Sequence, residues 1–244
     1  MANLRQQNDD ITFMKSYQCI LFDLDHTLWD FDLNSKETLR GLFDHFKLTD
    51  RGISGFDYFY SVFVRVNTKL WQLHDQNLIG TDEIRMQRFH KVLSEAGLDD
   101  YPFSLTFSAA FLDELPKKKN LLPNTLDVLN YLHGRYPMAI VTNGFDELQA
   151  NKMHASGIHH YFQRIVTSQR AGAKKPERRI FDFTLAEMGF TPAQSLMIGD
   201  NLQTDIAGAR MAGLDTVYFN PHNSPHQESV TYEINDLKHL TSIL

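Results

Sequence analysis

Residues 19–27, CILFDLDHT, are the most informative segment of this chain for its fold. Its first four residues are continuously apolar, and two aspartates, Asp23 and Asp25, follow directly. An unbroken apolar run is typical of a strand that is buried on both faces, as in a parallel sheet between two layers of helices. Cys19, the only cysteine in the sequence, is therefore expected to be a buried strand residue. A chain without an intrachain disulfide fits a reducing cytoplasm, where we expect this protein to act.

Two further apolar runs end in the same way. MAIV, residues 138–141, leads into Thr142, and LMIG, residues 196–199, leads into Asp200. In open α/β sheets, ligands bind beyond the carboxyl ends of the strands. The pattern therefore predicts that Asp23, Thr142 and Asp200 lie together at one edge of a sheet.

Helical spacing of apolar residues separates these runs. The expected helices cover residues 125–133, a segment around 180–185, and residues 203–211, with Gly213 placed to end the last one. Strand and helix thus alternate along the chain. This alternation predicts an α/β fold whose core is a doubly wound, Rossmann-like and mostly parallel sheet.

Over a hundred residues separate the first apolar run from the second, far more than a crossover connection needs. Residues 34–112 look almost wholly helical, and glycines provide the breaks between helices. The expected helices are 35–47, 57–74, 81–96 and 103–113. We interpret residues 33–113 as a helical cap inserted into a core that comprises 17–32 and 114–244, preceded by a polar tail, 1–16.

The two aspartates after the first strand have the chemistry that phosphoryl transfer requires. That reaction needs an anionic nucleophile, a general acid for the leaving oxygen, and cations on the phosphoryl oxygens. Asp23, held against a metal, would be ionised and could form an aspartyl-phosphate. Asp25 would protonate the leaving group and then activate the water that cleaves the intermediate. Taken alone, the same pair could be turn formers or helix caps.

Three further elements complete the pattern. Thr142, Asn143 and Gly144 could start a helix, form an anion cradle, or do both. Lys175 supplies the fixed cation that two carboxylates and a phosphate require, with Lys174 as the alternative for the same role.

The last element is Asp200 with Asp205 five residues further on. Taken alone, Asp200 could simply end a strand, and Asp205 could be an acidic residue on the surface of a helix. As chemistry, a second strand-end carboxylate that converges with Asp23 makes an oxygen-rich site for Mg²⁺, which would offset negative charge during transfer.

Taken in order, these elements resemble the four motifs of the haloacid dehalogenase superfamily of phosphohydrolases, over about residues 17–244. DLDHT, residues 23–27, resembles the first motif, Thr142 the second, Lys175 the third, and Asp200 with Asp205 the fourth. The helical insert resembles the first cap class (C1) of subfamily I in that superfamily.

The resemblance implies roles for individual residues. Asp23 would be the nucleophile and Asp25 the general acid and base. Mg²⁺ would bind the carboxylates of Asp23 and Asp200 and the main-chain carbonyl of Asp25, with Asp205 supporting the metal site from behind. Phosphate would be bound by Thr142, Asn143 and Lys175.

Within the superfamily, three segments look like the bacterial pyrimidine 5′-nucleotidases. They are DLDHTLWDF (23–31), VTNGF (141–145), and Lys175-Pro176 with IFD (180–182). One departure is that Lys174 stands where alanine is commoner, which leaves the assignment of the lysine open. UMP, dUMP and dTMP are the substrates this resemblance favours. The cap-side residues expected to contact the leaving group are Trp29, Phe31, Asn67, Trp71 and Arg88.

The bulk properties narrow the remaining choices. The net charge of −6 and the pI near 6.0 argue against a nucleic-acid binder, and no stretch approaches a membrane span. We therefore expect a small phosphorylated metabolite as partner and a monomer or weak homo-oligomer. A sugar-phosphate phosphatase, a phosphomutase of the same superfamily, and a non-catalytic binding module remain alternatives. Dehalogenation is disfavoured because it has no need of Asp25 as a proton donor.

Overall fold

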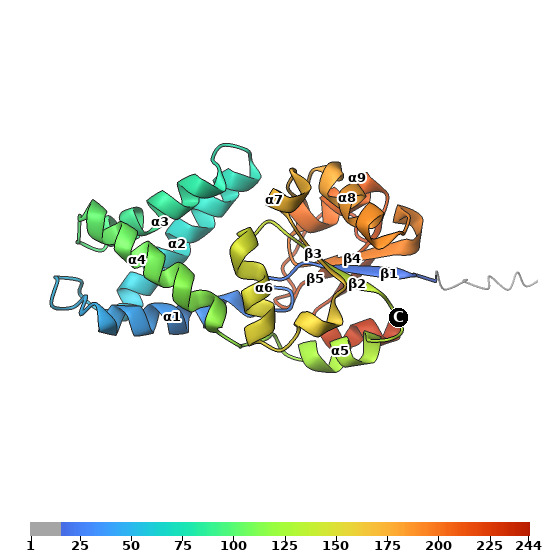
Figure 1. The fold of residues 1–244 in the computed structure, drawn as a ribbon, viewed down its shortest axis with the longest axis horizontal. Coiled ribbons are helices and arrows are strands. Elements are labelled where there is room, and N and C mark those ends of the chain that lie inside the picture. Colours follow the sequence, from blue (N-terminus) through green and yellow to red (C-terminus); the bar gives the residue numbers. More distant parts are fainter. Residues whose placement is uncertain (1–15) are drawn as a thin grey trace, which may run out of the picture.

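A computed structural model describes residues 16–244 of the chain (Figure 1). Apart from Ser16, the polar tail predicted for residues 1–16 lies outside the described residues. No helix within residues 16–244 combines the length and the apolar composition that a membrane crossing needs.

The core is one six-stranded sheet with the strand order β3-β2-β1-β4-β5-β6, and all neighbouring strands are parallel. The predicted α/β, doubly wound, parallel fold is confirmed. Its strands are β1 (Cys19–Phe22), β2 (Met138–Thr142), β3 (Arg164–Thr167), β4 (Ser195–Gly199), β5 (Asp215–Phe219) and β6 (Tyr232–Ile234). Sequence analysis named β1, β2 and β4, the three central strands, whose side chains are all buried. It missed the outer strands β3, β5 and β6.

The register of the central strands brings their carboxyl ends level. Phe22 is paired with Ile140 of β2 and with Ile198 of β4. Asp23 therefore lies within one residue of the level at which β2 ends in Thr142 and Asp200 follows β4. The chain also reverses its winding direction on either side of β1, which is where ligands bind in such sheets.

Helices cover both faces of the sheet because alternate strand residues point to opposite sides. Ile20 and Phe22 pack on the side of α5 (Thr125–Leu132) and α6 (Asp146–Ala155). Cys19, which is fully buried as expected, and Leu21 pack on the other side. That second face is covered by the helices α7 (Ser168–Ala171), α8 (Arg178–Met188) and α9 (Gly208–Ala212).

The helix predicted over residues 203–211 differs in its first half. Residues Leu202–Ala207 form a π-helical turn, and the α-helix α9 begins only at Gly208. The Asn201 side chain accepts hydrogen bonds from the backbone N–H groups of Gln203 and Thr204, at 2.9 and 3.1 Å, and so caps the start of this turn. Gly213 follows α9 in the left-handed conformation, φ +91°, as expected for a residue that ends a helix.

Four helices between β1 and β2 form a separate group on the side toward which β1 runs (Figure 1). Their mutual packing rests on aromatic side chains such as Phe63, Phe89 and Phe111. The first helix begins earlier than expected because Asp30 caps it by accepting from Leu33 N at 2.9 Å. The helices are α1 (Phe31–His45), α2 (Phe56–Asp75), α3 (Thr81–Glu95) and α4 (Tyr101–Glu114). We refer to α1–α4 as the cap, with the boundaries 33–113 remaining a prediction.

Candidate active site

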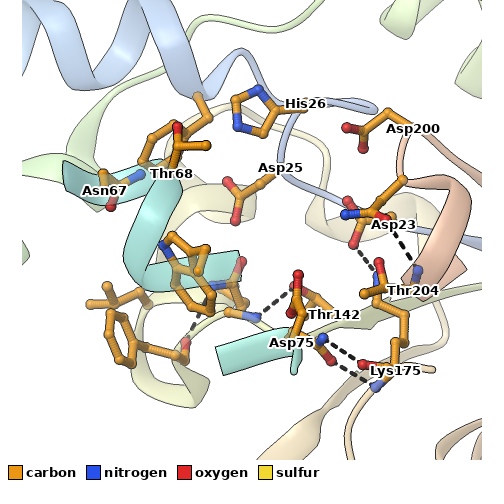
Figure 2. A pocket seen from close by; sticks show the side chains of 18 of the residues that line it. Asp23, Asp25, His26, Asn67, Thr68, Asp75, Thr142, Lys175, Asp200 and Thr204 are labelled. Carbon is orange, nitrogen blue, oxygen red and sulfur yellow. Dashed lines mark hydrogen bonds and ion pairs between the residues drawn. The ribbon is translucent and has the colours of Figure 1, made fainter. Parts of the chain in front are cut away.

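A cavity of about 350 Å³ lies between the carboxyl edge of the sheet and the cap. Its walls include Asp23 and Asp25 after β1, Thr142 at the end of β2, Lys175 in the loop before α8, and Asp200 after β4. These residues come from distant parts of the sequence, and Figure 2 shows them around one space. The parallel register of the strands is what brings them together.

Lys175 forms the centre of the ionic network. Its Nζ donates to Asp23 Oδ1 and, at 2.6 Å, to Asp205 Oδ1, and its side chain is only 3% exposed. Burial opposes its charge, but Asp205 and Asp23 outweigh this effect and raise the pKa of Lys175. Lys174 turns instead to the main-chain carbonyl of His74 in the cap. Lys175 is therefore the lysine that faces the carboxylates.

The acidic side chains compete for this one ammonium group. Burial, together with Asp205 and Asp200, raises the pKa of Asp23 in spite of the opposing effect of Lys175. Burial and Asp205 likewise raise the pKa of Asp200 to about 6, even though Thr27 Oγ1 donates to its Oδ1 at 2.9 Å. The protein alone thus leaves these carboxylates short of positive charge.

A divalent cation fits this deficit. One carboxylate oxygen from each of Asp23, Asp200 and Asp205 lies within 4.8 Å of the others. Asp205 is already occupied, because Oδ1 accepts from Lys175 and Oδ2 accepts from the Asn201 N–H at 3.0 Å. Asp23 and Asp200 are the carboxylates left with oxygens for a metal. An all-oxygen donor set with few carboxylates suits Mg²⁺.

The close approach of Asp205 depends on a glycine at the end of β4. A Cβ atom on Gly199 would overlap the carboxylate of Asp205. The absence of a side chain at this position therefore lets Asp205 reach Lys175 from behind the strand end.

Asn143, which follows β2, holds the loop that carries Lys175. Asn143 Oδ1 accepts from the Lys175 N–H at 2.8 Å, and Asn143 Nδ2 donates to the Lys175 carbonyl at 2.9 Å. These two bonds occupy the Asn143 side chain and fix the backbone of the lysine loop. Thr142 Oγ1 accepts from the Gly144 N–H at 3.1 Å and faces the cavity.

Sequence analysis missed Lys152, which lies on α6. Its Nζ donates to both carboxylate oxygens of Asp25, at 2.8 and 2.7 Å, and its side chain is 3% exposed. Lys152 shares the buried face of α6 with Leu148, Gln149 and Met153. A lysine at an inward helical position was the one signal that could have indicated it.

The cap-side residues differ in where the structure places them. Phe31, Asn67, Trp71 and Arg88 line the cavity. Trp29 does not: it is completely buried, its ring lies beneath Lys152 Nζ at 4.7 Å, and it is absent from the cavity wall. Trp29 therefore does not face the cavity as expected, because backbone bridges to Asp25 and Leu121 hold it in the interior.

Comparison with known proteins identifies the class to which this fold and site belong. The family model of haloacid dehalogenase-like hydrolases matches residues 17–213. The chain belongs to this family of hydrolases, and the family expected from its four motifs is confirmed.

Individual relatives match nearly the whole chain. The HAD-hydrolase YfnB of Bacillus subtilis is 31% identical, over 95% of this chain and 97% of the relative. Pyrimidine 5′-nucleotidase PynA of Streptococcus pneumoniae is 30% identical, over 93% and 95% of the two chains. Pyrimidine 5′-nucleotidase YjjG of Escherichia coli is 31% identical, over 92% and 96%.

A solved structure shares the complete architecture. The crystal structure of YfnB superposes with a TM-score of 0.84 at 29% identity, covering 94% of this chain and 99% of that one. That crystal is described as bound to magnesium and as revealing interdomain movement.

Proposed function

We propose that this protein is a Mg²⁺-dependent phosphoric monoester hydrolase that cleaves pyrimidine nucleoside 5′-monophosphates. The observation that carries the proposal is the extent of the similarity to two pyrimidine 5′-nucleotidases, which covers more than nine-tenths of this chain and therefore includes the cap. The sheet edge supplies the phosphate chemistry, whereas the leaving group must lie on the cap side of the cavity. Similarity across both parts supports a shared leaving group as well as a shared reaction. We expect a cytoplasmic monomer or weak homo-oligomer.

The side chains suggest how the two half-reactions proceed. In the first, a carboxylate oxygen of Asp23 bonds to phosphorus, the bond from phosphorus to the leaving oxygen breaks, and Asp25 gives that oxygen its proton. In the second, Asp25 takes a proton from water as the water oxygen attacks phosphorus. Phosphate then leaves, and the carboxylate of Asp23 is restored.

The surrounding groups hold this arrangement in place. Lys175 keeps Asp23 oriented and supplies positive charge beside the phosphoryl group, and Thr142 offers a hydroxyl at the same edge. Mg²⁺ would be held by Asp23, Asp200 and the main-chain carbonyl of Asp25, with Asp205 behind them. When bound, the ion would supply positive charge to the phosphoryl oxygens.

A panel of phosphate esters tests the function. Free phosphate is measured with Mg²⁺ present for UMP, dUMP, dTMP, AMP, GMP, hexose phosphates and glycolate phosphate. We expect kcat/KM for the pyrimidine nucleotides to exceed the others by at least ~10-fold, which corresponds to ~1.4 kcal/mol in the transition state. Asp23→Asn, shown to be folded by circular dichroism, is the inactive control because an amide is a poor nucleophile.

Each alternative function predicts a different result with these esters. A tenfold advantage of hexose or glycolate phosphates would replace the nucleotidase proposal with a sugar-phosphate phosphatase. Isomerised product from a hexose 1-phosphate, in place of free phosphate, would indicate a phosphomutase. If no ester releases phosphate with Mg²⁺ present, the protein is a non-catalytic binding module.

A further inference from the structure

The cap contributes a buried arginine to the cavity. Arg88 lies on α3, is 2% exposed, and lines the same cavity as Asp23 and Lys175. Its Nη1 donates to Asn67 Oδ1 on α2 at 3.2 Å. Its Nε and Nη2 are also buried, and neither has a hydrogen-bond acceptor within residues 16–244. Figure 2 shows Asn67 approaching from α2.

Two buried N–H donors without an acceptor require an explanation, since such groups are almost always satisfied in folded proteins. Burial and the nearby Arg85 lower the pKa of Arg88 to about 9, which still leaves it charged at neutral pH. The rings of Phe89 and Phe111 lie 5.2 and 5.0 Å from its guanidinium carbon. These rings attract the cation, but they do not replace acceptors for two N–H groups.

The two unsatisfied nitrogens have a shared geometry. The Nε hydrogen and one Nη2 hydrogen lie along one edge of a guanidinium and form a fork of parallel donors. The bond from Nη1 to Asn67 fixes the plane of the group while leaving this edge unused. The edge has donors only, so it suits an oxygen with two lone pairs and repels an amino group.

We infer that Arg88 recognises the C2 carbonyl oxygen of the pyrimidine base of the substrate. This inference rests on the proposed nucleotidase function. Uracil, thymine and cytosine all carry this oxygen beside the glycosidic nitrogen, and both of its lone pairs can accept from the fork. The corresponding purine atom, N3, has one lone pair, and in guanine an amino donor stands next to it. At the 4-position, uracil carries a carbonyl oxygen and cytosine an amino group. A fork of donors facing that position would therefore reject cytosine.

Modified substrates test this assignment on the unaltered protein. We compare kcat/KM for UMP, for 2-thio-UMP, and for the 5′-monophosphate of 2-pyrimidinone riboside, which keeps O2 and has no 4-substituent. We expect the 2-pyrimidinone nucleotide to stay within about threefold of UMP and the 2-thio nucleotide to fall by about 10-fold, because sulfur is the weaker acceptor. The opposite order, with loss from removing O4 and none from 2-thio substitution, would overturn the assignment.

Variants test it from the protein side. In Arg88→Lys and Arg88→Met, kcat/KM for UMP should fall by about 10- to 100-fold, the range for losing a hydrogen bond from a charged donor. Ribose 5-phosphate, which has no base, should change by less than about twofold because it makes no such bond. Arg65→Met, which alters an exposed arginine of α2 paired with Glu95, is the matched control and should leave both substrates unchanged. A parallel fall with both esters would indicate a structural role and contradict the inference.

The inference and the proposed function fail in different ways. Equal rates with purine and pyrimidine nucleotides in the wild-type protein would overturn both. A pyrimidine preference that persists in Arg88→Met would overturn the role of Arg88 and leave the nucleotidase function standing.

Discussion

At the scale of single residues, Lys152 fixes the side chain of Asp25, the residue proposed as general acid. Asp25 is held from α6 by two hydrogen bonds to one buried ammonium group, so its carboxylate has a defined position before any substrate arrives. The same ammonium lies over the ring of Trp29. Trp29 and Lys152 therefore support the loop that carries Asp25 from beneath the cavity.

We predict that Lys152→Met lowers kcat by at least about 10-fold with little change in KM, because Asp25 loses its fixed position but the phosphate contacts remain. The free energy of unfolding should fall by about 1–3 kcal/mol, the usual cost of leaving a largely buried polar group without its partner. Steady-state kinetics and urea denaturation measure the two effects.

Lys152→Arg is the control, since it can still donate two hydrogen bonds to a carboxylate. It should recover most of kcat. A Lys152→Met protein with wild-type kcat would show that Asp25 needs no support from α6.

At the scale of elements, the end of β4 and the π-helical turn after it act together. The turn begins at Leu202, and the backbone N–H groups of Asp205 and Ile206 both donate to the carbonyl of Asn201, at 3.0 and 3.2 Å. The π-helical turn places the side chain of Asp205 against Gly199. Sequence analysis predicted a regular helix from residue 203, and the backbone bond from Ile206 to Asn201, five residues back, is what departs from it.

A methyl group at the end of β4 tests this packing. Gly199→Ala should lower the free energy of unfolding by about 1–3 kcal/mol, the range for overpacking, because Asp205 must move away. Mg²⁺-dependent activity should fall as well, since Asp205 would no longer hold Lys175. Thermal denaturation and phosphate release provide the measurements.

Gly41→Ala in α1 is the matched substitution with the opposite expectation. No heavy atom lies within 4 Å of the added carbon, so the change should stabilise the helix by about 0.5–1 kcal/mol. Equal effects of the two substitutions would contradict the packing argument.

At the scale of the whole molecule, the negative charges of the site give stability a dependence on pH. The pKa of Asp200 rises from its ordinary value of 3.8 to about 6 on folding, so the folded state binds a proton more tightly than the unfolded chain. The stability that this contributes is fully present below about pH 4 and is lost as the pH rises through 6. Metal-free protein should therefore lose stability between about pH 4 and pH 6.

Mg²⁺ should reverse this loss because it binds the ionised carboxylates. We predict that the increase in Tm between chelator and excess Mg²⁺ is larger at pH 7 than at pH 5. Calorimetry at both pH values measures it, and Asp200→Asn should reduce both the metal effect and its pH dependence. An equal increase in Tm at both pH values would contradict the prediction.

The residues at the carboxyl edge of the sheet could be predicted from the sequence alone. Asp23, Thr142 and Asp200 each follow a continuous apolar run, and such runs become inner parallel strands because a strand inside a parallel sheet is buried on both faces. The edge strands β3 and β6 escaped detection because they are short, partly exposed and interrupted by charged residues. The inner strand β5 is mostly buried, but it opens with Asp215 and Thr216 and so lacks the continuous apolar run of the strands that were detected.

The side chains that meet across the cavity could be identified only from the folded structure. Lys152 looks like an ordinary helix residue in the sequence, and what distinguishes it is burial beside Asp25, 127 residues away in the chain. Arg88 was expected on the cap side of the cavity, but its bond to Asn67, 21 residues away, was not. Trp29 looked like a substrate contact and is enclosed instead. Local patterns report which face of an element is buried, whereas partners depend on how elements pack, which periodicity does not encode.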